Sequence, residues 1–227
     1  MAVTRSFVIR QVVDDRVPVA LAFHRDHLTE YLWPRTRDEF EALVQEESLY
    51  EAVERTGGAN DIVGICYVTD GEEPQRPGMP RLEFGGVYVT DECRGLGVAK
   101  ALGIIAISNA FAWDPPQGRL IGHVHEANPL PRPLMERLGF VLVGQEIPPP
   151  EVAPPTMARN ARGEVVGDLF EFRRETLARF ADWIEAFDGR LVAERERVVS
   201  QLEVQLPLMV AYRPEALVAL RNIASNS

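Results

Sequence analysis

The chain has 227 residues and a mass of 25.4 kDa, which suits one large domain or one domain with an appendage. Apolar residues make up 46% and charged residues 26%, so disordered, collagen-like and disulfide-scaffold classes are excluded. The 34 acidic and 24 basic residues give a net charge of −10, which argues against nucleic acid as the main partner and favours cations such as amines.

No apolar run reaches the length that a membrane helix requires, and charged residues come too early at the N-terminus for a secretory signal. Cys66 and Cys93 are the only cysteines, which indicates a reducing compartment and no disulfide framework. We therefore expect a cytoplasmic protein with no membrane partner.

Strand and helix patterns alternate along the first part of the chain. In chain order we expect a strand over 6–13, helices over 17–31 and 37–54, a strand over 61–69, a turn-rich loop over 70–80 and a strand over 81–90. Gly57-Gly58 marks the end of the second helix, and Gly85-Gly86 predicts a bulge or a close backbone approach.

The second part begins with a long apolar pattern and ends with amphipathic ones. We expect a helix over 97–113, a strand over 120–125, a short helix over 131–138, strands over 140–147 and 164–172, and helical segments over 175–187, over 191–205 and from Pro214 onward. Five prolines in 147–163 predict an extended loop. This order is typical of an α+β (α/β-like) sheet with helices on its faces.

The stretch from Val87 to Ala101 is the most informative one, because a β-branched strand runs into a glycine turn and then a helix. A helix N-terminus presents unpaired N–H groups, and glycines let a phosphate approach them closely. The alternative is a tight connection that binds nothing. Lys100 stands where a dinucleotide fingerprint needs its third glycine, and it follows alanine where a P-loop needs glycine.

The turn resembles the pyrophosphate loop of the GNAT superfamily of acyl-CoA-dependent N-acetyltransferases, Gln/Arg-x-x-Gly-x-Gly/Ala, in Arg94, Gly97 and Ala99. Asn128 after the next strand and Gly139-Phe140 after the next helix extend the resemblance over about two-thirds of the chain. It implies a GNAT fold over 1–172, with a mixed, mostly antiparallel sheet flanked by helices and the proline-rich loop 147–163 inside it. Residues 173–227 would form a helical extension.

The resemblance also implies acetyl-CoA as co-substrate. Backbone groups of Val87 and Val89 would bind the pantetheine arm, and Asn128 would contact it near the thioester. The amides of the loop would hold the pyrophosphate, and its members are Arg94, Gly95, Gly97, Val98 and Ala99. Lys100 and Arg132 would either meet outer phosphates or be solvated.

Acetyl transfer to an amine needs a neutral nitrogen, so a base must remove the proton of the ammonium form. Glu83 lies eleven residues before Arg94, which resembles the position of the glutamate base in the histone-acetylating branch of the superfamily. On the strand we expect Glu83 to share a face with Gly85 and Val87. The alternative is an edge-strand charge that pairs with Arg81 or with solvent.

One departure from the family concerns the leaving thiolate. Many GNAT enzymes place a tyrosine seven residues after the asparagine as general acid, whereas this chain has Met135, which has no proton to donate. Either Tyr88, Cys93 or water serves instead, or the thiolate leaves unassisted. The leading hypothesis is an N-acetyltransferase acting on a primary amine of a small molecule or protein. The alternatives are an inactive acyl-CoA-binding regulatory module and a structural partner acting through its tail.

Three other groups of residues have either a functional interpretation or an interpretation as ordinary packing. The pairs His123/His125 and His24/His27 have spacings that suit a metal, but two cysteines and no H-E-x-x-H motif favour packing or acceptor-site polarity, so no metal is expected. The connection 31–35 lines the acceptor pocket in GNAT proteins, or its Trp33 caps a small core. In 191–205 an apolar stripe is placed to pack on the main domain or to form a homodimer; its members are Val192, Val199, Leu202 and Leu206.

Overall fold

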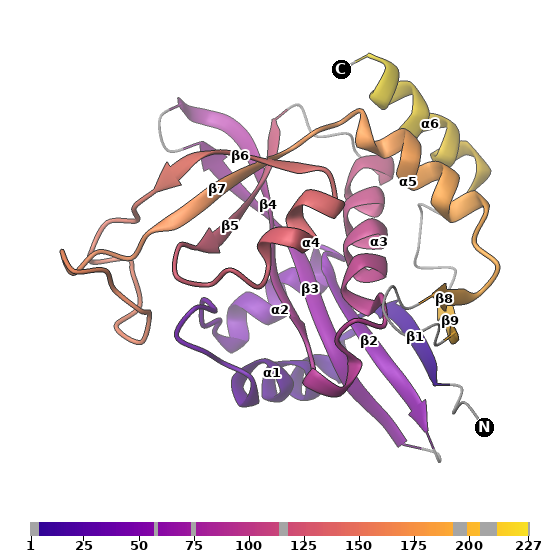
Figure 1. Cartoon of the computed structure of the whole chain (residues 1–227), viewed down its shortest axis with the longest axis horizontal. Helices are drawn as coiled ribbons and strands as arrows, with labels where there is room; N and C mark the ends of the chain where they lie inside the picture. Colours follow the sequence, from indigo (N-terminus) through magenta and orange to yellow (C-terminus); the bar gives the residue numbers. More distant parts are fainter. Residues whose placement is uncertain are drawn as a thin grey trace.

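The computed structural model describes residues 5–56, 59–73, 76–113, 118–192, 199–204 and 213–226. Over these residues nine strands form one sheet in the order β6-β7-β5-β4-β3-β2-β1-β9-β8, with helices on both of its faces (Figure 1). None of the helices in the described ranges is long and apolar enough to cross a bilayer.

The sheet is mixed and mostly antiparallel, as predicted. Its strands are β1 Ser6–Gln11, β2 Leu49–Thr56, β3 Ala59–Glu73, β4 Arg76–Val89, β5 Arg119–His125, β6 Phe140–Glu146, β7 Gly167–Phe172, β8 Arg190–Val192 and β9 Val199–Val204. Among the described residues, β4 pairs with β5 and β1 with β9 in parallel, and the other neighbours are antiparallel.

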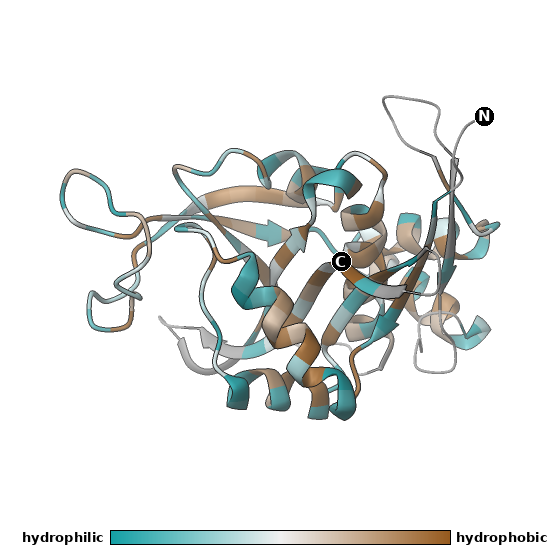
Figure 2. Cartoon of the chain, turned by 90° about the horizontal axis from the view of Figure 1, so that it is seen from below, coloured by the Kyte–Doolittle hydropathy of each residue, from teal (hydrophilic) through white to brown (hydrophobic). Residues whose placement is uncertain are grey.

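Helices cover the sheet from two sides, which Figure 2 shows as two groups with the strands between them. The helices are α1 Val17–Asp26, α2 Arg37–Gln45, α3 Val98–Trp113, α4 Arg132–Arg137, α5 Thr176–Glu185 and α6 Pro214–Ser225, with short 3-10 turns η1 Asp14–Arg16 and η2 Asp91–Cys93. One core, around Phe84 and Leu102, lies between the sheet and α3, α5 and α6. The other, around Phe40 and Tyr67, lies under α1 and α2. The predicted α+β class with helices on the sheet is therefore confirmed.

The helix predicted over 37–54 is wrong in its second half. A capping box of Thr36 and Glu39 starts α2, but the helix ends at Gln45, and Glu47 adopts a φ of +54°. From Leu49 onward the chain is β2, held between β1 and β3. Its side chains alternate between the two cores, which is the period of a strand and not that of the predicted helix.

Two other predictions are also corrected. The loop predicted over 70–80 is largely strand, because β3 runs to Glu73 and β4 begins at Arg76. The helix predicted over 191–205 contains β8 and β9 instead, because β9 supplies a parallel partner for the edge of β1. The stripe proposed there is therefore not helical at Val192, Val199 or Leu202, while Leu206 lies outside the described residues. Homodimerisation stays a prediction.

The predicted irregularity at Gly85-Gly86 is a β-bulge. The register between β3 and β4 shifts between Ile65 and Tyr67, and Gly86 has a φ of +60°. A Cβ on Gly86 would lie 2.0 Å from Cε1 of Tyr67, so the ring of Tyr67 packs directly on this backbone. Glycine is thus required here by both conformation and space.

We expect Gly86→Ala to lower the free energy of unfolding by about 2–4 kcal/mol, because it combines a left-handed alanine with a steric clash. Denaturant unfolding measures the loss. Gly163→Ala is the matched control, since Gly163 has a φ of +78° and a Cβ there meets nothing within 4 Å. Equal losses in the two variants would show that the contact with Tyr67 contributes nothing.

Candidate active site

Within the described residues, the strands β4 and β5 pair over only three residues each. The parallel register joins Arg81 to Arg119 and ends where Glu83 meets Ile121, while β4 continues to Val89 and β5 to His125 (Figure 1). Two central strands that separate in this way leave the backbone groups of their facing edges without partners in each other. The sheet therefore opens at its centre, directly beyond Glu83.

The turn between β4 and α3 lies beyond the end of β4. Gly95 and Gly97 have φ values of +80° and +85°, which only glycine adopts without strain. Within the described chain, the amides of Gly95, Gly97, Val98 and Ala99 have no backbone acceptor, and the first turn of α3 has no acidic side chain. Free amides at the positive end of a sixteen-residue helix suit an anion such as a diphosphate.

Arg94 ties this turn to the strand before it. Its Nε donates to the carbonyl oxygen of Val89 at 3.2 Å, and its terminal nitrogen pairs with Asp91 at 2.8 Å. The methyl group of Leu191 in β8 lies 3.7 Å from where a Cβ of Gly97 would be, so residues after 172 support the turn from behind. Thus the guanidinium of Arg94 is used to shape the turn, while the amides of Gly95, Gly97, Val98 and Ala99 have no backbone acceptor among the described residues.

The other residues assigned to the cofactor lie around the same opening. Val87 and Val89 belong to the part of β4 that pairs with β3 and not with β5, and they turn their side chains to the core under α3. Asn128 follows the end of β5, where its side-chain oxygen accepts from the amide of Leu130 at 3.3 Å. The predicted set is therefore brought to one region: the end of β4, the glycine turn and the end of β5.

Glu83 lies on the opposite face of β4 from Val87, so the prediction that they share a face is wrong. The bulge at Gly86 inserts one extra residue and reverses the alternation after Gly85. Glu83 consequently faces the side of α1 and α2, where Tyr67 lies, while Phe84 and Val87 face α3. Glu83 and Val87 therefore lie on opposite sides of the sheet.

Glu83 is hydrogen-bonded to His123, a contact that sequence reasoning missed. Nδ1 of His123 lies 3.1 Å from Oε1 of Glu83, and its Nε2 lies 2.9 Å from Oε2 of Glu146. Burial raises the pKa of Glu83, but the hydrogen bond and charge of His123, together with the charges of Arg81 and Arg35, lower it by more, so its net pKa lies below the ordinary value. Burial lowers the pKa of His123, yet the two carboxylates raise it by more.

A loop closes over this face from the far end of the sheet. The segment 147–166 between β6 and β7 projects to the left in Figures 1 and 2 and leads back to the sheet as β7, which pairs with β5. Its Ala158 donates to the carbonyl of Glu30 at 2.8 Å and accepts from Nε2 of His125 at 2.9 Å. Trp33 packs on Met157 and its neighbours in a small separate cluster. The small core predicted at Trp33 is thus formed with residues of the loop, and the two together cover this face of the sheet.

Several other residues that the sequence analysis considered for the site have contacts elsewhere in the protein. Arg132 forms an ion pair with Asp168, whose side chain is buried. Met135 is 4% exposed, and its methyl group lies 2.4 Å from where a Cβ of Gly122 would be, so it packs directly on β5. Cys93 is buried beside Arg5. In the described ranges there is no cluster of three or more metal-binding side chains.

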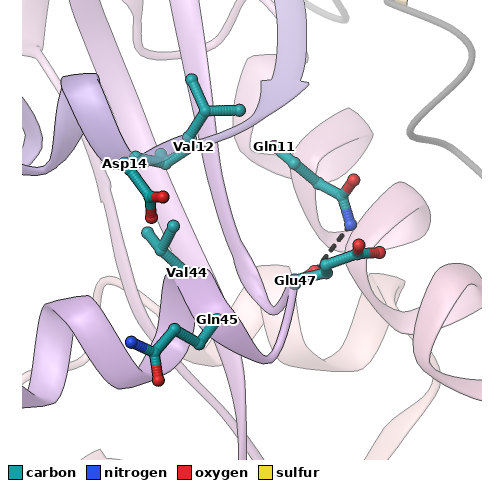
Figure 3. Close-up of a pocket in the computed structure, with 7 residues that line it drawn as sticks. Gln11, Val12, Asp14, Val44, Gln45 and Glu47 are labelled. Carbon is teal, nitrogen blue, oxygen red and sulfur yellow. Dashed lines mark hydrogen bonds between the residues drawn. The ribbon is translucent and has the colours of Figure 1, made fainter.

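A cavity of about 310 Å³ lies elsewhere, beside β1 and the end of α2 (Figure 3). It is lined by Gln11, Val12, Val13, Asp14, Val44, Gln45 and Glu47. The amide of Gln11 points to the backbone carbonyl of Glu47 and donates to it at 2.6 Å. Because β2 and β3 separate β1 from β4, this cavity is not part of the opening.

Comparison with known proteins identifies the fold of the chain. No protein-family model and no curated protein matches the sequence. Among solved structures, the NatC complex bound to Gag peptide and CoA matches with a TM-score of 0.55, 18% identity, and coverage of 73% of this chain and 97% of that one. Arabidopsis thaliana NAA60 in complex with acetyl-CoA matches with a TM-score of 0.55, 16% identity, and coverage of 73% of this chain and 98% of that one.

An acetyltransferase of the GNAT family from Streptococcus pneumoniae gives a TM-score of 0.52, 18% identity, and coverage of 73% of this chain and 98% of that one. The chain therefore has the GNAT fold, as predicted.

Proposed function

We propose that the protein is an N-acetyltransferase that transfers an acetyl group from acetyl-CoA to a primary amine of a small molecule or protein. The observation that carries the proposal is the combination of a central sheet opening with four free amides at the N-terminus of α3. An extended chain can add to the free edge of β4 as a strand would, and a diphosphate can accept from the amides. The CoA-bound structures of the same fold support this.

In this proposal residues 1–172 hold the acyl-transfer groups, and 173–227 brace the turn through Leu191. Val87 and Val89 hold the pantetheine arm with their backbone. Gly95, Gly97, Val98 and Ala99 hold the diphosphate with their amides, Arg94 fixes the turn, and Asn128 contacts the arm near the reacting end. Bound acetyl-CoA supplies a thioester carbonyl that an amine can attack.

Glu83 accepts the proton that the amine must lose. The amine approaches from the face of α1 and α2, and its proton passes to Glu83, directly or through one water. His123 lies 3.1 Å from Glu83 and holds the accepting carboxylate in place. The new C–N bond forms as the C–S bond breaks and the thiolate leaves.

The leaving thiolate receives no proton from the position where the family usually has tyrosine. Met135 occupies it and is packed against Gly122 in the core. Solvent therefore protonates the thiolate, which a thiol of ordinary acidity permits near neutral pH. The same observation favours the second candidate function, a GNAT-fold module that binds an acyl-CoA without turnover.

One experiment separates the two functions. Calorimetry with CoA tests binding, and thiol release from acetyl-CoA against a panel of amines and N-terminal peptides tests turnover. Binding with amine-dependent thiol release supports the enzyme, and binding without release supports the non-catalytic module. Absence of both contradicts the whole proposal.

A further inference from the structure

The imidazole of His123 lies between two carboxylates from different strands. Glu83 comes from β4 and Glu146 from β6, and the two hydrogen bonds of 3.1 and 2.9 Å use both ring nitrogens. An imidazole donates from both nitrogens only when it is protonated. The geometry therefore favours an imidazolium with a carboxylate at each end.

Glu146 reaches His123 across β7 at Gly167. Gly167 of β7 pairs with Glu146 on one side and with His125 on the other. A Cβ on Gly167 would lie 3.4 Å from Cδ2 of His123, which is van der Waals contact, so the ring of His123 lies directly over this residue. The strand order β6-β7-β5-β4 thus places a residue of the sheet edge against the centre of the site.

Arg81 holds the outer carboxylate from the other side. One terminal nitrogen of its guanidinium lies 3.2 and 3.4 Å from the two oxygens of Glu146, and the Arg81 side chain is only 12% exposed. The charges alternate as Arg81, Glu146, His123 and Glu83, so each group stabilises the ionised form of the next. A chance surface contact would not use both nitrogens of one ring and both oxygens of one carboxylate.

We propose that Glu146 is a positioning residue: held by Arg81, it fixes His123 so that the ring's Nδ1–H donates to Glu83 and keeps that carboxylate oriented on the acceptor face. This inference rests on the proposed function for its catalytic meaning, while the coupling of Glu146 to His123 is testable without turnover. Other charged and titratable groups near the pair are Arg35 from the α1–α2 connection and Tyr67 from β3, which face Glu83, and His125, which is bonded to Ala158.

The test compares Glu146→Gln with Glu171→Gln. Glu171 is a matched control because it lies on the neighbouring strand β7, pairs with Arg119 at 2.7 Å, and has a side chain 29% exposed against 30% for Glu146. Histidine resonances are followed by NMR against pH, and a His123→Gln variant identifies the signal among the four histidines. We expect Glu146→Gln to move the titration of His123 to lower pH and Glu171→Gln to leave it in place.

Activity supplies the second readout. We expect kcat/KM of Glu146→Gln to fall about tenfold with the KM for acetyl-CoA unchanged, and the pH profile to move in the same direction as the NMR titration. A His123 titration that is the same in Glu146→Gln and in the parent overturns the inference. A shifted titration in a protein that lacks all turnover would contradict the proposed function and leave the coupling of the two residues intact.

Discussion

Replacing Glu83 with glutamine is expected to lower kcat/KM for amine acetylation by about 100- to 1000-fold, because glutamine keeps the shape of the side chain and has no basic oxygen to accept the proton. The affinity for CoA should be unchanged, since Glu83 lies on the face of β4 opposite Val87. Steady-state kinetics with a saturating amine, together with calorimetry of CoA, measures the two effects.

The pH dependence distinguishes Glu83 from its neighbour. The pKa of Glu83 lies below its ordinary value, so the carboxylate is ionised throughout the neutral range and its own titration falls below that range. The pKa of His123 is raised, so a change of rate near neutral pH reports the imidazole. Glu39→Gln is a suitable control, because Glu39 pairs with Arg35 near the same face without contacting His123. A Glu83→Gln variant with the parent kcat/KM would contradict the assignment of the base.

The glycine turn could be predicted from the sequence because its requirements are local. The stretch from Val87 to Ala101 contains a β-branched strand, two glycines that adopt left-handed backbone and the start of an apolar helix. The order of strands and helices from β4 to β6 could be predicted from the sequence for the same reason. By contrast, the local pattern predicts helix over most of β2 and over β8 and β9. These segments are strands because β2 pairs with β1 and β3, β9 with β1, and β8 with β9.

The cluster around Glu83 could be predicted only in part. The position of Glu83 before the turn indicated a base, and the alternation of His123 and His125 placed both histidines on one strand face. The contact between His123 and Glu146 depends on β7 entering between β5 and β6, which brings together residues that are 23 positions apart in the sequence. The bulge at Gly86 likewise reverses a face, which a strict period of two along the strand does not anticipate.

Placing a negative charge at the start of α3 is expected to have opposite effects on stability and on cofactor binding. Ala99 lies in the first turn of α3, which has no acidic residue, so aspartate there is favoured by the helix dipole. The same carboxylate repels a diphosphate held by the amides of Gly97 and Val98. We expect Ala99→Asp to weaken CoA binding about 100-fold without lowering the unfolding midpoint, since two like charges about 5 Å apart near a surface cost about 3 kcal/mol.

Ala99→Asn is the matched control, because it adds nearly the same volume without the charge. Ala99 packs partly against the main core, so any steric effect appears equally in both variants. Calorimetry of CoA at two salt concentrations completes the test, because repulsion between exposed charges weakens with ionic strength and a packing defect does not. Equal losses of affinity in the aspartate and asparagine variants would place the diphosphate away from the amides at the start of α3, and the acetyltransferase proposal would lose its main support.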